Sequence, residues 1–519
     1  MTASTAAPAR EPDATPPPSR RVGLDAVLVG LVVVVGIVLR FVTTSDLWFD
    51  EALSVNLAKL PLSELGEALR HDGAPPLYYT LLHFWIEVFG SGDFAVRAFS
   101  GLISVASLPL AYLAGKRIGG RAVAWWTVMI LAASPYAIRY ATESRMYALV
   151  MFLVLWGYLA LRRALDSPTL GRLTVVALVT SLLVYTQYWC FYVLAVVGVG
   201  LLCAWWRGSP ATKRAAPRII AAMAVGGLTL IPWLSSLTYQ LAHTGTPWGD
   251  PVVPWFAFAE GVVTFAGGDE NAEAFILLLP LLLLPLLGLL GKPIDGHRIE
   301  LDLRTRPAVR WELGAAVAIL LFGATVSWVA GSAFEGRYAA VMFPLFVLSV
   351  GYGLTAFADR RVRAVVLAVT VALSFVSAAR NITLDRTQAG QVADVIKAQA
   401  EPDDLVVYCP DQIGPDVSRL LEGEPLRQTT FPDGERPERV NWVDYQDRIA
   451  AQDPAEFAAR MLERAGDHTI WYVSSGGYNN VEGVCELMGT AFANERTPET
   501  PVLPDDEIFE LMGLTVFRA

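Results

Sequence analysis

Long apolar runs, each close to the length needed to cross a lipid bilayer, dominate the first 380 residues of this sequence. A membrane-spanning helix needs about 20 mostly apolar residues. Only 17% of the 519 residues are charged, against about 25% in soluble globular proteins, so a large soluble enzyme is excluded. We predict a multi-span α-helical membrane protein with about eleven transmembrane helices. The predicted spans are 22–42, 94–115, 122–140, 146–161, 173–186, 188–206, 219–236, 272–291, 311–330, 338–357 and 364–380.

Basic residues divide the predicted loops into two sets. Cytoplasmic loops carry an excess of Lys and Arg. Together with the N-terminus, one set of loops holds 21 Lys and Arg, whereas the alternate loops and their edges hold seven. We therefore place the N-terminus in the cytoplasm, and an odd number of spans places the C-terminus outside. Residues 1–21, rich in Ala, Thr and Pro, are predicted to be a disordered cytoplasmic lead-in, followed by a retained helix rather than a cleaved signal peptide.

One segment decides this orientation. Residues 75–89 form an apolar stretch of 15 residues that includes His83 and Glu87. The stretch is short for a span, and if it crossed the membrane every later loop would change sides. We predict instead an amphipathic helix at the outer interface, where its Tyr and Trp side chains are favoured. The first external loop is then long, about residues 43–93.

Residues 381–519 differ in charge from the rest of the chain. They hold 26 of the 50 acidic residues but only 11 of the 40 basic ones. Short β-type runs alternate there with helical runs, which predicts an extracytoplasmic α/β domain that follows a membrane domain of residues 22–380. The predicted strands are 404–409, 469–474 and 514–517, and the predicted helices are 389–399, 454–465 and 481–493. Whether Cys409 and Cys485 of this domain are paired is left open.

The basic residues outside this domain are scattered between apolar runs rather than clustered. A nucleic-acid partner is therefore excluded, and the lipid bilayer is the partner that the composition requires. The acidic domain contains no glycine-rich phosphate loop, so no nucleotide site is predicted there.

Four polar clusters fall on the predicted external side, where charge at the membrane edge indicates function by default. The first, residues 48–51, places Asp50 and Glu51 after two aromatic residues. Adjacent carboxylates suit a general base and a second polar or metal-binding group. The alternative, with equal weight, is that they open a helix whose dipole favours them.

The second cluster, residues 71–79, contains His71, two prolines, Tyr78 and Tyr79. A structural interpretation is favoured here over a functional one, because prolines suit the first turn of a helix.

The third cluster, residues 139–147, contains two arginines around Glu143 and ends in Tyr147. Arginine is disfavoured on the outer side of a membrane. Phosphate binding by Arg139 and Arg145 explains the presence of these two arginines better than a structural Arg–Glu pair does. The fourth cluster, residues 335–338, contains Arg337 and Tyr338. Anchoring to lipid headgroups is the slightly favoured alternative for this lone arginine.

The external loop 238–272 adds Trp248 and Trp255 and has no Lys or Arg. These aromatic residues are candidates for contact with a sugar or acceptor, or equally for interface anchors. Taken together, acids and arginines from distinct segments meet one membrane face, which favours chemistry on an anionic, lipid-linked substrate.

The ordered set 48–54, 75–79, 143–147 and 337–338 resembles bacterial glycosyltransferases of the GT-C superfamily, and most of all family 39. That family includes protein O-mannosyltransferases and the aminoarabinose transferase of lipid A. The resemblance covers about residues 22–380, and the tail resembles the small periplasmic domains that many such proteins append.

The resemblance implies transfer of a sugar from a polyprenyl monophosphate to an acceptor hydroxyl outside the bacterial cytoplasmic membrane. The acceptor is a glycan, a glycolipid or a protein. The family's catalytic aspartate corresponds to Asp50, its acidic neighbour to Glu51, and its second acidic position to Glu143. Its arginines near the donor phosphate correspond to Arg145 and Arg337.

Further donor or acceptor contacts are expected from Tyr338, His71, Tyr78 and Tyr147. The mannosyltransferases typically have His directly before Pro-Pro, where this chain has Ala74. This departure leaves the acceptor and any divalent metal ion at this loop open. No other cofactor is expected.

The chemistry agrees with the residues. A polyprenyl phosphate leaves with its own charge, so cations rather than a nucleotide pocket receive it. A sugar hydroxyl needs a carboxylate to take its proton, and a single displacement inverts the anomeric carbon.

Two other classes of protein remain as alternatives. A transporter is expected to show internal repeats and charges near the middle of the membrane, and neither is found in the sequence. A non-enzymatic receptor that senses with its external domain leaves the four polar clusters without a role.

Overall fold

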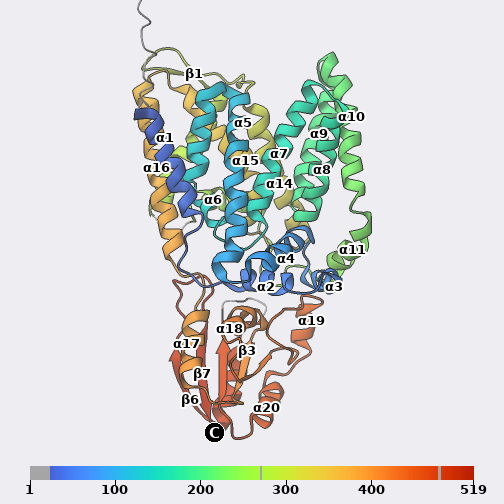
Figure 1. Cartoon of the computed structure of the whole chain (residues 1–519), viewed down its shortest axis with the longest axis vertical. Coiled ribbons are helices and arrows are strands. Elements are labelled where there is room, and N and C mark those ends of the chain that lie inside the picture. The colour runs from blue at the N-terminus through green and yellow to red at the C-terminus, as the bar shows by residue number, and fades with distance from the viewer. Residues whose placement is uncertain (1–23, 269–271, 477, 479–480) are drawn as a thin grey trace, which may run out of the picture.

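The computed structural model describes residues 24–268, 272–476, 478 and 481–519. The predicted lead-in, residues 1–21, lies outside this range. A large helical part occupies one end of the molecule and a smaller domain with a β-sheet the other, with α2, α3 and α4 between them (Figure 1). The chain is a multi-span helical membrane protein with a C-terminal mixed-sheet domain.

The helical part follows the apolar runs. Six of its described helices are long and apolar enough to cross a membrane, and a bent pair, α10 with η1 and α11, makes up to seven. Three more apolar helices are shorter: residues 26–39, 170–186 and 343–356. The elements are α1 (Leu24–Leu39), α5 (Asp93–Ala133), α6 (Pro135–Arg139), α7 (Tyr147–Asp166), α8 (Leu170–Thr186), α9 (Cys190–Arg207), α10 (Pro210–Leu228), η1 (Ile231–Trp233), α11 (Leu234–His243), α12 (Pro254–Phe265), α13 (Ala272–Leu290), α14 (Arg310–Val329), η2 (Gly336–Val341), α15 (Phe343–Gly353), η3 (Leu354–Ala356) and α16 (Arg360–Thr383). A small hairpin of β1 (Gly291–Pro293) and β2 (Ile299–Leu301) lies at the end opposite the sheet domain (Figure 1).

Helix α5 contains two predicted spans in one assigned element. Its backbone breaks at Gly119 and Gly120, and Gly120 has a φ of 80°, which an L side chain rarely adopts. A Cβ atom added at Gly115 would lie 2.9 Å from the Cα of Ala124. Nine residues of straight helix rise about 13.5 Å, so the chain must double back between them. Helix α5 therefore consists of two antiparallel helical limbs, one on each side of this break.

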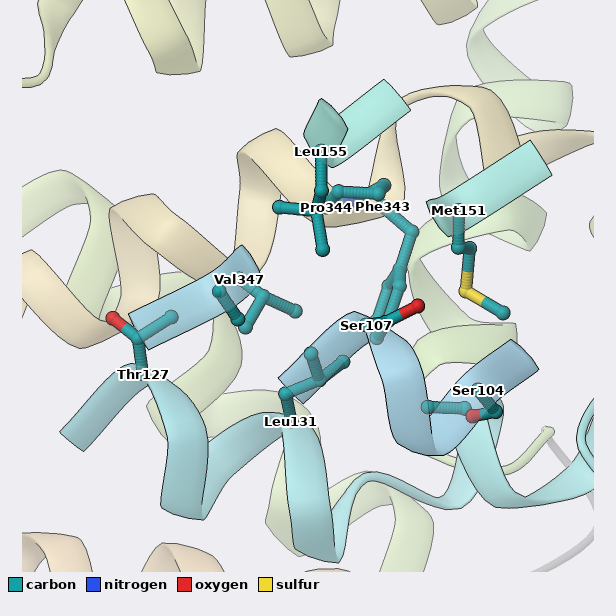
Figure 2. Close-up of a pocket in the computed structure, with 11 residues that line it drawn as sticks. Ser104, Ser107, Thr127, Leu131, Met151, Leu155, Phe343, Pro344 and Val347 are labelled. Carbon is teal, nitrogen blue, oxygen red and sulfur yellow. The ribbon is translucent and has the colours of Figure 1, made fainter. Parts of the chain in front are cut away.

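A cavity of about 10 Å³ lies between α5, α7 and α15, about the space that one water needs. Figure 2 shows the hydroxyl groups of Ser104 and Ser107 and the side chain of Thr127 around it, among apolar side chains. This cavity is too small for a substrate.

The loop that was predicted to be external folds into three helices: α2 (Phe49–Ala58), α3 (Leu62–Asp72) and α4 (Leu77–Phe89). Helix α4, of 13 residues, is about 20 Å long, which is short of the hydrocarbon thickness of about 30 Å. It packs against α2, α5 and α8 and buries Tyr78, Tyr79 and Leu82. That α4 lies at the outer interface rather than crossing the membrane stays a prediction.

The C-terminal domain is built on a five-stranded sheet in the order β4-β3-β5-β7-β6. Strands β4, β3 and β5 are parallel, whereas β7 and β6 join antiparallel. Its elements are α17 (Ala389–Gln399), β3 (Leu405–Cys409), η4 (Asp411–Ile413), α18 (Gly414–Leu420), β4 (Arg427–Thr430), α19 (Tyr445–Ala450), α20 (Pro454–Ala465), β5 (Ile470–Ser474), α21 (Val484–Glu495), β6 (Thr497–Val502) and β7 (Gly513–Arg518). A disulfide joins Cys409, at the end of β3, to Cys485 on α21.

The sheet domain docks on α2 and on the start of α5 through polar contacts. The amide of Asn56 on α2 donates to the carbonyl of Glu438 at 2.8 Å, and Arg419 contacts Asp93 of α5 at 2.9 Å. Helix α2 is therefore held between the helical part and the sheet domain.

Candidate active site

Asp50 lies in the first turn of α2, between two arginines from distant segments. Its Oδ2 atom is 3.7 Å from a guanidinium nitrogen of Arg145 and 3.7 Å from one of Arg337. All three side chains are mostly buried, with 13%, 13% and 15% of their surface exposed. Oδ2 has no hydrogen-bond partner among the described residues. The predicted first, third and fourth clusters thus meet at this carboxylate.

Arg145 is oriented by hydroxyl groups from α2 and α4. One guanidinium nitrogen donates to Ser54 at 3.0 Å and to the hydroxyl of Tyr79 at 3.2 Å. Ser54 in turn donates to the carbonyl of Asp50 at 2.7 Å. Helix α2 therefore positions both Asp50 and the group that orients Arg145.

Arg337 lies among aromatic rings. Its guanidinium carbon is 5.8, 5.4 and 5.9 Å from the ring centres of Trp48, Trp248 and Tyr338. Such cation–π contacts stabilise a charge where water is excluded. The hydroxyl of Tyr136 donates to the carbonyl of Arg337 at 3.2 Å, which fixes the backbone. Arg337 is thus a mostly buried cation with aromatic rings around it, beside Asp50.

Glu143 lies in the turn between α6 and α7 and is 1% exposed. Its closest charged partner is Arg139, at 3.4 Å, and neither carboxylate oxygen has a hydrogen bond among the described residues. Burial raises the pKa of Glu143 to about 7. An unpartnered buried carboxyl group is costly, so this group is available to hydrogen-bond a ligand.

Glu51 differs from its neighbour Asp50 because its oxygens are already engaged. It is fully buried and accepts two hydrogen bonds from Arg97, at 2.8 and 2.6 Å. The amide of Ser144 donates to it at 2.8 Å, and Arg386 is 3.6 Å away. These contacts join α2 to α5, to the Glu143 turn and to the segment after α16.

The other predicted residues have different surroundings. The hydroxyl of Tyr78 contacts Ser100 at 3.0 Å, inside the packing of α4 on α5. The ring of Tyr147 packs edge-on against Tyr140, and that of Tyr338 stacks on Trp189.

His71 contacts Glu67 at 3.4 Å and faces a cleft of about 1080 Å³ between α2, α3 and the sheet domain. Among the described residues, the contacts found for His71 do not join it to the Asp50 cluster. The ligand-binding role predicted for His71 stays a prediction.

Sequence reasoning missed Asp72 and Tyr79 as members of this site. Tyr79 donates to Asp72 at 3.4 Å as well as contacting Arg145. Burial raises the pKa of Asp72 to about 6. Both residues lie in the second polar cluster, but nothing in the sequence placed that cluster beside Arg145.

The described residues contain no group of three or more His, Cys, Asp or Glu that could hold a metal ion. Three guanidinium groups, those of Arg139, Arg145 and Arg337, face two carboxyl groups, those of Asp50 and Glu143. Arg145 and Arg337 suit an anionic ligand, because guanidinium groups bind phosphate strongly.

Comparisons with known proteins found solved structures with a similar fold. No protein-family model matches the sequence, and no curated protein matches it. The structure is similar to ArnT from Cupriavidus metallidurans in the apo state, with a TM-score of 0.59, 13% identity, and coverage of 95% of this chain and 98% of that chain. ArnT bound to undecaprenyl phosphate gives a TM-score of 0.52, 14% identity, and coverage of 95% and 97%. An oligosaccharyltransferase from Archaeoglobus fulgidus gives a TM-score of 0.47 and 11% identity, with coverage of 88% of this chain and 72% of that chain. The chain thus shares the fold of these ArnT structures, and the fold that the sequence resemblance predicted is confirmed.

Proposed function

We propose that the protein is a membrane glycosyltransferase that moves a sugar from a polyprenyl-phosphate donor to an acceptor hydroxyl. The observation that carries this proposal is the Asp50 carboxylate, with one oxygen free of hydrogen bonds between Arg145 and Arg337. This arrangement places a base, Asp50, beside two cations that are proposed to bind a phosphate. The similarity to an ArnT structure that holds undecaprenyl phosphate supports the class of donor.

In the proposed reaction Asp50 accepts the proton of the acceptor hydroxyl. The acceptor oxygen forms a bond to the anomeric carbon as the bond from that carbon to the phosphate oxygen breaks, which inverts the configuration. The polyprenyl phosphate leaves with its negative charge, which Arg145 and Arg337 stabilise. No covalent enzyme intermediate is required.

The remaining predicted residues receive supporting roles. The unpartnered oxygens of Glu143 suit a hydrogen bond to the sugar or acceptor. Glu51 is proposed to position Asp50, because its ion pairs with Arg97 and Arg386 leave little capacity for a substrate. Tyr78 and Tyr147 are proposed to shape the site by packing, and Tyr338 to line it beside Arg337.

We further propose eleven crossings within a membrane domain of about residues 22–380. Support comes from the six long helices, the bent pair, the three shorter apolar helices and the second limb of α5. The loop charges favour a cytoplasmic N-terminus, which puts the active site and the domain of about residues 381–519 outside the cytoplasmic membrane.

The decisive experiment is an assay of purified protein in detergent or lipid vesicles with polyprenyl-phosphate sugars. We expect release of free polyprenyl phosphate that depends on the donor and rises with an acceptor extract of glycan, glycolipid or protein. The double substitution of Arg145 and Arg337 by Ala is the matched control and must abolish release. Donor translocation without cleavage would instead support a transporter, and binding without either would support a receptor.

A further inference from the structure

The start of α2 is held by the C-terminal domain rather than by its own residues. Trp48, the residue that precedes the helix, makes no side-chain capping bond. The first amide groups of a helix have no acceptor within the helix. The amide of Phe49 instead donates to both carboxylate oxygens of Glu510, at 3.2 and 3.1 Å. A residue 461 positions away in the sequence thus does the work of an N-cap.

Neighbouring contacts strengthen this attachment. The ring of Phe509 packs edge-on against that of Trp48, with 5.3 Å between their centres. Arg386, just beyond α16, is 3.6 Å from Glu51. The residues on both sides of Asp50 are therefore held by residues that follow the last long helix.

Glu510 is in turn held by a second buried carboxyl group. Asp416 and Glu510 face each other, and both are at most 5% exposed. Two ionised carboxyl groups this close repel each other strongly where water is excluded, which favours a state in which the pair shares one proton. The hydroxyl of Thr387 donates to Asp416 at 3.1 Å.

The charged and titratable groups around Asp416 and Glu510 do not neutralise a second negative charge on this pair. Within the described part of the chain, neither Asp416 nor Glu510 forms an ion pair. Tyr478 faces both carboxyl groups, and Asp50 follows Phe49 on α2. Arg386 is engaged by Glu51 and by Thr142, at 3.6 and 2.8 Å.

We propose that Glu510 is a positioning residue for Asp50, and that the proton it shares with Asp416 makes this positioning dependent on pH. The role rests on the proposed function of Asp50. When the shared proton is lost, two buried negative charges repel each other and the hold on Phe49 weakens. Burial raises the pKa of Asp416 to about 6 and that of Glu510 well above its ordinary value. The attachment is therefore intact at low pH and weakens as the pH rises through these raised pKa values.

The activity test compares Glu510→Ala with Glu510→Gln. The amide oxygen of Gln accepts from Phe49 and its amino group donates to Asp416, without any shared proton. We expect Glu510→Ala to lower kcat on the order of 10–100-fold, as a misplaced catalytic group does, with little change in KM for the donor. Glu510→Gln should restore kcat and should lack the decline at high pH that the natural protein shows.

Glu507→Ala is the matched control, because Glu507 is exposed and lies three residues before Glu510. It should leave kcat and the pH profile unchanged. Equal kcat for Glu510→Ala and the natural protein would overturn the proposal, and so would a failure of Glu510→Gln to rescue. If Glu510→Ala does not fold, Asp416→Asn provides the test. This variant should keep kcat at neutral pH but should not show the decline of kcat at high pH. A decline of kcat like that of the natural protein would count against the shared proton.

Hydrogen exchange provides a readout that does not require activity. Peptides that cover α2 should exchange faster in Glu510→Ala than in Glu507→Ala at the same pH, and Glu510→Gln should match the control. Unchanged exchange in Glu510→Ala would refute the attachment. If Asp50→Asn proved fully active, the proposed function would fail while the exchange result still decided whether Glu510 holds α2.

Discussion

At the scale of single residues, Asp50 and Arg337 are expected to fail in different ways. Asp50→Asn keeps the shape but cannot accept a proton, and loss of a general base costs about 10²–10⁴ in rate. Donor affinity should change little, because Arg145 and Arg337 are proposed to hold the phosphate. Arg337→Ala should weaken donor binding as well, since a hydrogen bond to a charged group contributes about 1.5–3 kcal/mol. Single-turnover rates and donor titrations of the purified variants separate the two.

The structural alternative for Asp50 predicts a different result. Asn is nearly as good as Asp near a helix start, so an Asp50 that only stabilised α2 would be replaced without loss. Turnover near that of the natural protein in Asp50→Asn would contradict the catalytic role. Arg419→Ala is a suitable comparison for Arg337→Ala, because the contacts of Arg419 among the described residues are with Ser91 and Asp93 at the domain interface.

At the scale of elements, α4 decides on which side of the membrane the site lies. Its 13 residues pack along α2, α5 and α8, and we expect that it does not cross. A reporter fused after Ala519 should then be active only outside the cytoplasm, and one fused within the loop after Arg207 only inside. Activity of the C-terminal reporter inside the cytoplasm would reverse every loop and remove the site from the outer face.

Elements could be predicted where a single periodicity describes them. Helices α17 and α20 begin and end where the sequence predicted, because their apolar positions repeat with helical spacing. Strands β4 and β6 were missed, since Arg427–Thr430 and Thr497–Val502 are polar edge strands without alternation. The break in α5 was visible only as a gap between two apolar runs.

Part of the site could also be predicted from the sequence. Asp50, Arg145 and Arg337 stand out because charge at a membrane edge is costly. Their meeting at one point depends on tertiary packing, as does the full engagement of Glu51 by Arg97. Glu510 has no signal at all, because one more acid in an acidic domain is not conspicuous.

At the scale of the whole molecule, buried acids predict how stability depends on pH. Burial raises the pKa values of Asp72, Glu143, Asp411 and Asp416 to between about 6 and 7. Between the ordinary carboxyl pKa of about 4 and these values, the folded protein holds protons that the unfolded chain has lost. Stability therefore falls as the pH rises over this interval.

We expect the thermal unfolding midpoint of the purified protein to decrease from pH 5 to pH 7. Asp411→Asn should reduce the slope, because Asp411 is buried against the hydroxyl of Tyr445 and one pKa unit corresponds to about 1.4 kcal/mol. Asp447→Asn, at an exposed position of the same domain, should leave the slope unchanged. A midpoint that rises over this range would contradict the buried, protonated state.

The attachment of Phe49 to Glu510 also sets an order of events during biosynthesis. A ribosome adds about 5–20 residues per second, so the 461 residues between the two take roughly 20–90 s to make. In the proposed topology, the first loop is exported during this interval, before its cap has been made. A chain that ends before Glu510 keeps Asp50 but lacks the contact proposed to position it. We therefore expect the site to reach its working geometry only after the last segment has been made and has docked.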